Sequence, residues 1–165
     1  YAITATIGRR EIMEAAQSTF ISSTFWTERI GPAAALKTLD VMGRERSWEQ
    51  ITATGKNIAD RWLGLAKQHN LDIGITGLPA LIGFGFQSSA ALEYKTFITQ
   101  EMLKKGYLAG TSVYVCIEHT PEILDHYFET LEPIFEKIGQ CEISGGNATE
   151  LLDGPVCHSG FKRLN

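Results

Sequence analysis

Residues 47–105 carry the pattern that most constrains how this chain can fold. From Ser47 onward, apolar residues recur on one face near the 3.6-residue period of an α-helix that should end near Asn70. These residues are Ile51, Ile58, Trp62, Leu65 and Ala66. Two short runs, 72–76 and 81–86, surround Gly77-Leu78-Pro79 and are typical of strands joined by a turn. Another helix, 89–105, is expected to follow, so a long helix precedes a small sheet that helices must cover.

Two local signals refine this segment. Ser47-Trp48-Glu49-Gln50 has the spacing of a capping box, in which the serine hydroxyl accepts a bond from the third helical N–H. In the run 81–86, Gly83 and Gly85 alternate with larger apolar residues. That alternation predicts a glycine face on which another backbone or a helix comes close.

The remaining segments complete an α+β fold. We expect a strand at 3–7, short helices at 9–17 and 31–42, a strand at 112–118, and a long helix from Pro121 that Pro133 kinks or restarts. The order β-α-α-α-β-β-α-β-α predicts a small antiparallel sheet with helices on one face. We assign 46–140 to that α+β domain, 1–45 to the end of another, larger α/β domain with an inter-domain helix, and 141–165 to an irregular tail.

Composition excludes several classes of function. The net charge is −4 with no basic stripe, which argues against a nucleic-acid partner, and no apolar run has the length of a membrane span. Three cysteines cannot all pair with one another, so the count favours a cytoplasmic protein. None of the four histidines has the i, i+4 partner of a helical zinc site, so no metal is expected.

A hydroxyl-rich segment at 22–36 is the strongest candidate for a site. It runs Ser-Ser-Thr-Phe-Trp-Thr-Glu-Arg and leads directly into an alanine-rich helix. Hydroxyls at a helix entrance can bind an anion, because free backbone N–H groups and the positive end of the helix dipole lie there. The alternative is that Ser22, Ser23 and Thr24 only cap turns.

Several segments together resemble a known family. They are Gly8 to Met13, the hydroxyl-rich segment, Tyr107-Leu108-Ala109, Glu118-His119-Thr120 and the final amphipathic helix. In this order they resemble the C-terminal third of class III, fold-type I, pyridoxal-phosphate-dependent aminotransferases, in the branch of glutamate-1-semialdehyde aminomutase. The similarity extends to about Gly139. It implies the small C-terminal domain of such an enzyme, together with the end of its large domain.

The resemblance implies a cofactor site shared by two subunits. Members of this family are homodimers that bind pyridoxal 5′-phosphate at the subunit interface. The family's phosphate-binding threonine aligns with Thr24, with Ser23 and Phe25 as neighbours at the cofactor. Trp26, Glu28 and Arg29 are candidate substrate-binding residues, with packing at a dimer contact as the alternative. The lysine that forms the Schiff base is expected just before Tyr1, so no catalytic residue is assigned within these 165 residues.

One departure from the family concerns the reaction. In the aminomutase the segment after Tyr-Leu-Ala is longer and carries a Glu-Ala-Gly feature, whereas here only nine residues separate Ala109 from His119. We therefore expect transamination between an amino donor and an aldehyde or ketone. An intramolecular aminomutase and a stand-alone α+β binding or regulatory domain are the alternatives. A first strand this close to the start of the chain favours the C-terminal portion of a longer protein, with a trimmed product as the alternative.

Overall fold

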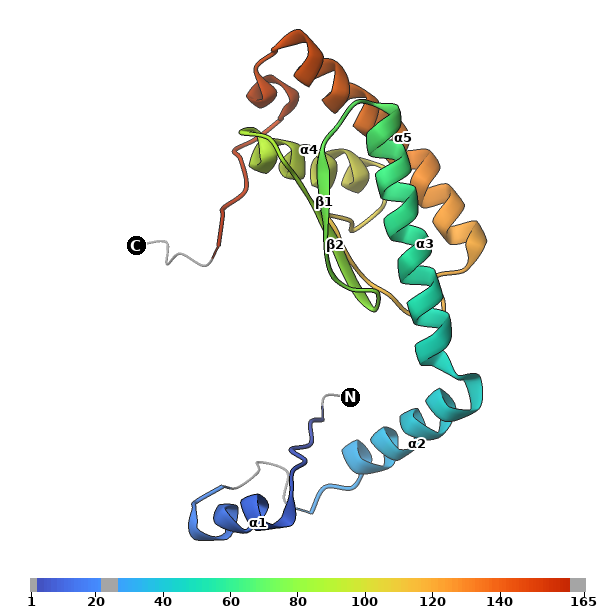
Figure 1. The fold of residues 1–165 in the computed structure, drawn as a ribbon, viewed down its shortest axis with the longest axis vertical. Coiled ribbons are helices and arrows are strands. Elements are labelled where there is room, and N and C mark those ends of the chain that lie inside the picture. The colour runs from blue at the N-terminus through green and yellow to red at the C-terminus, as the bar shows by residue number, and fades with distance from the viewer. Residues whose placement is uncertain (1–2, 22–26, 161–165) are drawn as a thin grey trace. The chain divides into compact units, whose positions relative to one another are not determined.

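The computed structural model describes residues 3–21 and 27–160. The chain divides into two compact units, Tyr1–Arg46 and Ser47–Asn165 (Figure 1). The described part of the first unit contains helix α1 (Arg10–Met13), the 3₁₀ helix η1 (Glu14–Ser18) and helix α2 (Ile30–Glu45). The second unit contains the elements that follow: α3 (Ser47–Gln68), β1 (Ile73–Leu78), β2 (Leu81–Phe86), α4 (Ala91–Lys104), β3 (Ser112–Tyr114), α5 (Pro121–Ser144) and the 3₁₀ helix η2 (Ala148–Leu151).

The expected strand at 3–7 is wrong, because residues 3–9 adopt no regular structure. A strand needs the backbone of a neighbour, and the sheet formed by the described residues uses β1, β2 and β3 alone. Large apolar side chains of this unit are exposed. They are Ile3, Ile7, Ile12, Phe20, Ile21, Ile30, Leu36, Leu39 and Met42. Among the described residues of this unit, therefore, no apolar core forms.

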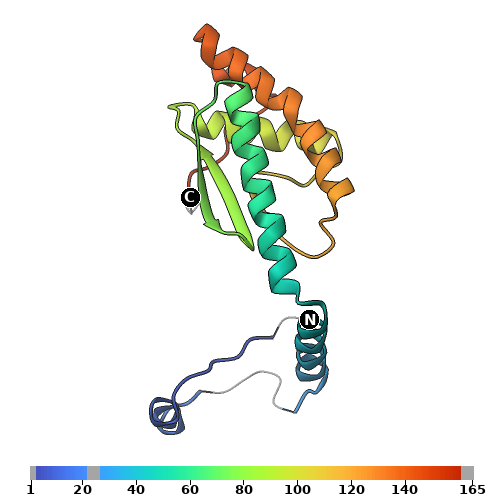
Figure 2. The same cartoon turned by 45° about the vertical axis from the view of Figure 1, so that its right-hand side comes forward.

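The second unit confirms the α+β prediction. Its strands form one antiparallel sheet in the order β1-β2-β3. Ile82, Phe84 and Phe86 of β2 are buried on one face of the sheet, as the two-residue period of a strand requires. The Phe84 ring contacts Trp62 of α3 at 4.7 Å and Phe135 of α5 at 5.8 Å, between ring centroids. Figure 2 shows the sheet beside these helices.

Helix α4 covers the same face of the sheet. The Phe86 ring lies 5.4 Å from that of Tyr94, and Phe97, Ile98 and Met102 of α4 are buried in the same core. The glycine face is less crowded than predicted. A Cβ at Gly83 would lie 3.1 Å from the Thr111 carbonyl oxygen, but one at Gly85 would meet nothing within 4 Å.

The ends of two predicted elements need correction. The Ser47 hydroxyl is buried without a hydrogen-bond partner, so its capping bond does not form. Only Arg46, in the left-handed region at φ 48°, separates α2 from α3, which leaves no extended capping residue. Strand β3 ends at Tyr114 because its pairing with β2 ends at Leu81, beside the hairpin turn.

The last helix and the tail also differ from expectation. Helix α5 continues through Pro133 to Ser144, because Leu131, Ile134 and Phe135 are buried on either side of the proline, which itself lies on the exposed face. The range 141–165 was expected to be an irregular tail, but its residues 141–144 belong to α5, Ala148–Leu151 form η2, and its backbone is bonded to α4. The Asp153 N–H donates to Gln100 Oε1 at 2.7 Å, and the Cys157 N–H donates to Thr96 Oγ1 at 2.9 Å.

Candidate functional site

Of the predicted site residues at 22–29, the structure describes Glu28 and Arg29. Glu28 is half-buried, and its carboxylate accepts bonds from the backbone N–H groups of Ile30 and of Gly31, the latter at 3.0 Å. Arg29 is exposed and is the residue that precedes α2. Ser23, Thr24, Phe25 and Trp26 lie outside the described residues. Their roles therefore stay predictions, as do those of Glu28 and Arg29.

The Glu28 carboxylate changes the electrostatics expected at this helix entrance. The first N–H groups of a helix lack partners within the helix and attract negative charge. Here Glu28 already occupies two of them. An anion bound beside α2 would have to compete with this carboxylate for those N–H groups, or bind through the side chains of the preceding segment.

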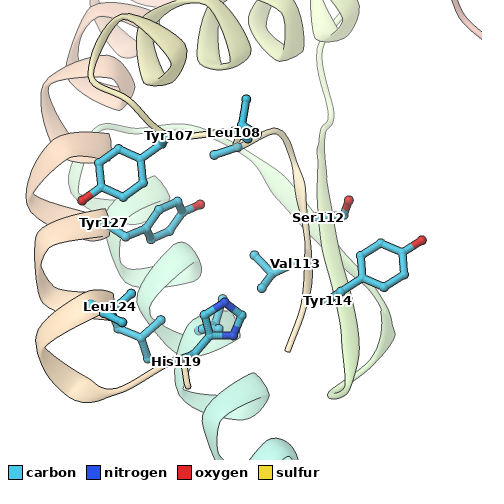
Figure 3. Close-up of a pocket in the computed structure, with 11 residues that line it drawn as sticks. Tyr107, Leu108, Ser112, Val113, Tyr114, His119, Leu124 and Tyr127 are labelled. Atoms are coloured by element: carbon cyan, nitrogen blue, oxygen red, sulfur yellow. The ribbon is translucent and has the colours of Figure 1, made fainter. Parts of the chain in front are cut away.

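A second concave site lies wholly within residues 47–165 and was not predicted from the sequence (Figure 3). It is a pocket of about 320 Å³ between α3, the segment 107–114 and the start of α5. Its lining is mostly apolar and aromatic and includes no Asp, Glu, Lys or Arg side chain. The lining residues are Ile58, Tyr107, Leu108, Ala109, Ser112, Val113, Tyr114, His119, Ile123, Leu124 and Tyr127.

Tyr127 is the buried polar group in the wall of this pocket. Its hydroxyl oxygen accepts a bond from Trp62 Nε1 at 3.1 Å, and its ring packs edge-on against Tyr107 at 6.3 Å between centroids. Burial raises the pKa of Tyr127 to about 12, because desolvation disfavours the phenolate. The hydroxyl therefore keeps its proton at neutral pH. Within the described part of the chain, no acceptor bonds that proton.

His119 supplies a second polar group. Its Nδ1 accepts the Cys116 N–H at 3.1 Å, which fixes the ring at the turn before α5. An imidazole nitrogen that accepts a bond carries no hydrogen, so the ring proton is on Nε2. His119 is half-buried and also borders a neighbouring hollow that contains Arg61 and Asp125. Those two charges pair with each other at 2.7 Å.

Sequence reasoning missed this pocket because its polar residues look structural. Tyr127 falls on the apolar stripe of α5 and is buried with the core, so its position in the helix predicts packing alone. In the sequence, Tyr107 and His119 belong to segments that indicate the family resemblance, and no pattern links them to a pocket. A usable signal was a histidine directly before the Thr120-Pro121 helix start, close in sequence to a strand end.

Further features limit the chemistry that the described residues can perform. No group of three or more His, Cys, Asp or Glu side chains in 3–21 and 27–160 could hold a metal ion. Within the same ranges, no helix is both long and apolar enough to span a membrane. All seven lysines in the described ranges are exposed. Lys104 donates to Glu101 and Asp153, and hydrogen bonding raises its pKa, which is the opposite of what a nucleophilic amine requires.

Comparison with curated proteins finds several amino-group-transferring relatives. The chain is 28% identical to a 3-aminobutyryl-CoA aminotransferase of Cloacimonas acidaminovorans (strain Evry) over 149 residues, which is 85% of this chain and 34% of that protein. It is 26% identical to a glutamate-1-semialdehyde 2,1-aminomutase of Neisseria gonorrhoeae (strain NCCP11945), across 78% of this chain and 34% of the relative. A 2′-deamino-2′-hydroxyneamine transaminase of Streptomyces kanamyceticus is 25% identical, across 79% of this chain and 34% of that protein.

The chain thus spans about one third of the length of the curated relatives it matches. No family model matches it. Among solved structures, the pyridoxal-phosphate internal aldimine form of the FumI protein of Sphingopyxis sp. MTA144 superposes with a TM-score of 0.72 at 19% identity, covering 88% of this chain and 36% of that one. That likeness establishes the fold. In sequence the chain is similar to about one third of these aminotransferases and aminomutases, and in fold it is similar to about one third of FumI.

Proposed function

We propose that this chain is the C-terminal portion of an enzyme that uses pyridoxal 5′-phosphate to move an amino group between an amino donor and an aldehyde or ketone. The observation that carries the proposal is the similarity to the aminobutyryl-CoA aminotransferase over 85% of the chain. The short segment between Ala109 and His119 favours transamination, because it lacks the Glu-Ala-Gly feature. The aminomutase relatives keep an intramolecular amino shift as the second candidate.

We propose that this chain contacts the cofactor at the phosphate group of pyridoxal 5′-phosphate. Thr24, with Ser23 and Phe25 beside it, would hold that phosphate, and Glu28 limits how this can occur. Since Glu28 accepts the Ile30 and Gly31 N–H groups, the hydroxyls of the preceding segment would supply the hydrogen bonds. The cofactor, when bound, supplies an electron sink for the carbon that exchanges its amino group.

The same proposal assigns a substrate-facing role to Trp26, Glu28 and Arg29. An exposed guanidinium such as that of Arg29 can bind a carboxylate with two parallel hydrogen bonds. Glu28 would position Arg29 by holding the first turn of α2 in place. The lysine that binds the cofactor would lie before Tyr1, and the exposure of the seven described lysines supports this assignment.

We further propose that the enzyme is a cytoplasmic homodimer with a shared active site. The exposed apolar side chains of residues 3–46 support a buried position for this unit in a larger assembly, because isolated domains rarely expose so many. The same exposure disfavours a stand-alone binding domain. The three cysteines are free, as expected in a reducing compartment.

The test compares Thr24→Ala with Thr19→Ala in the full-length protein that contains this chain. Thr19 is a matched control, because its exposed hydroxyl only donates to the Ala16 carbonyl at 2.9 Å. Loss of one hydrogen bond to a charged phosphate should weaken cofactor binding by about 10- to 150-fold. Dialysis followed by visible absorbance of the bound cofactor measures this. Equal cofactor affinity in the two variants would overturn the assignment of Thr24.

The reaction itself needs a separate assay. With an amino donor and an oxo acceptor present, a transaminase forms one new amine and one new oxo compound in equal amounts. An aminomutase instead converts one amino aldehyde into its isomer without a second substrate. Wild-type protein that binds no pyridoxal phosphate would overturn the whole proposal.

A further inference from the structure

We propose that the pocket between α3, residues 107–114 and α5 binds an uncharged small molecule with an aliphatic body and a carbonyl oxygen. The inference is independent of the proposed amino transfer, because the pocket lies entirely in residues 47–165 and involves none of the predicted cofactor residues. Its volume of about 320 Å³ lies within the range of small-molecule sites.

The lining determines that the molecule is uncharged. No Asp, Glu, Lys or Arg side chain lines the pocket. A carboxylate or ammonium group bound there would lose its hydration without gaining an ion pair. Arg61 and Asp125, in the neighbouring hollow, neutralise each other at 2.7 Å, and the Arg61 guanidinium also lies 4.1 Å from the centre of the Phe128 ring.

Two hydrogen-bond donors determine that the molecule offers an acceptor. The Tyr127 oxygen is occupied by Trp62 Nε1, so its proton is the group that it can still offer. His119 likewise has only a donor left to offer, because its Nδ1 accepts the Cys116 N–H and its proton is on Nε2. A carbonyl oxygen has two lone pairs and accepts from either donor. A ligand that only donates would leave both donors without a partner.

Figure 3 shows how these groups lie in the pocket. The Tyr127 hydroxyl and the His119 ring are on its inner side, whereas the hydroxyl of Tyr114 is directed away from it. Val113 and Leu124 add apolar surface to the lining. The arrangement is therefore an apolar site with two separate donors, which suits a molecule of several carbons that carries an amide or ketone.

The experiment titrates the full-length protein that contains this chain with three probes of equal length: hexanamide, hexanoate and hexylammonium. Binding is followed by ¹H–¹⁵N NMR. Hexanamide should shift the amide signals of residues 107–114 and 119–127 in a saturable manner, with a Kd on the order of 1 mM for a fragment of this size. The two charged probes should bind at least tenfold more weakly. No saturable shifts with hexanamide, or equal affinity for hexanoate, would overturn the proposal.

The variants test the donors. Tyr127→Phe removes one neutral hydrogen bond and should weaken hexanamide binding by about 2- to 12-fold. Tyr114→Phe is the matched control, because Tyr114 lines the same pocket but its hydroxyl is directed away from the interior. This variant should bind hexanamide as tightly as the wild type does. If Tyr127→Phe fails to fold, His119→Ala tests the second donor at a half-buried position. A folded variant at either donor that binds hexanamide as tightly as the wild type contradicts the assignment of that donor.

Discussion

Two glycines of α3 provide a direct test of how that helix packs. A Cβ at Gly55 would lie 1.9 Å from the carbonyl oxygen of Pro79 and 2.6 Å from its carbonyl carbon. Both atoms belong to the backbone of the β1–β2 turn, so a rotamer change cannot relieve the overlap. A Cβ at Gly64, in the same helix, would meet nothing within 4 Å. Gly55→Ala and Gly64→Ala are therefore one chemical change in two environments.

The expected effects have opposite signs. Replacing a glycine inside a helix by alanine stabilises it by about 1 kcal/mol, because alanine loses less backbone entropy. Gly64→Ala should show this gain alone. At Gly55 overpacking costs about 3 kcal/mol, the upper part of the usual range, because the overlapping atoms are backbone. The net loss for Gly55→Ala is then about 2 kcal/mol after the gain in helix propensity.

Thermal unfolding of the 165-residue chain, followed by far-UV circular dichroism, measures both variants. For a chain of this size the melting temperature should fall by about 4–8 °C for Gly55→Ala and rise by about 2–4 °C for Gly64→Ala. If Gly55→Ala were as stable as Gly64→Ala, the turn at Pro79 would not rest against α3, and the packing of the hairpin on this helix would be wrong.

Three further predictions concern caps and titrating groups. Thr120→Ala should destabilise the chain by about 1 kcal/mol, and Thr120→Ser by less, because the Thr120 hydroxyl oxygen accepts the Ile123 N–H at the start of α5; urea unfolding checks this. A hydrogen bond from Lys104 lowers the pKa of Glu101 below its ordinary value of 4.5. The ionised Glu101 therefore stabilises the folded chain above pH 4.5, and this stabilisation is lost as the pH falls through the lowered pKa. Glu101→Gln should therefore lose less stability than the wild type during acid titration, and equal losses would contradict this. Burial raises the pKa of Tyr127 from 10.0 to about 12, so the stability gained from keeping this group protonated is present below pH 10 and is lost between pH 10 and about 12. In unfolding experiments across this alkaline interval, Tyr127→Phe should therefore lose less stability than the wild type.

The second unit could be predicted well from the sequence. Residues 47–69 were expected to be helical and α3 is Ser47–Gln68, and the run 81–86 is strand β2. Both patterns are local, since side chains of a regular helix or strand return to one face at a constant period. Gly106 lies just after α4 with a φ of 86°, which is typical of a glycine at a helix end.

The first unit and the tail could not be predicted in the same way. The run at 3–7 alternates as a strand does, but pairing depends on a neighbouring backbone that its own residues do not specify. Likewise, nothing in residues 147–157 shows that their backbone would bond to Gln100 and Thr96 of α4. Pro133 was expected to interrupt α5, yet burial on both sides of it maintains one helix.

The two candidate sites differ in the same way: one was predicted from the sequence, and the other is visible only in the structure. Thr24 and its neighbours are sequence predictions, and for Glu28 the structure adds the bonds that hold the start of α2. The pocket joins Ile58, Val113 and Tyr127, which come from different elements. Sequence periodicity predicted that Tyr127 faces the core, but not that Trp62, 65 positions away, occupies its oxygen.

By itself the sequence determined where most helices and strands of the second unit lie, the apolar face of α3 and the family likeness, because these depend on residue types at short, regular spacing. Tertiary structure decided which donors lack a partner and where a cavity is left between the packed elements. The physical reason is that hydrogen-bond satisfaction and cavity shape depend on atoms that are distant in sequence and meet only after the helices have packed on the sheet.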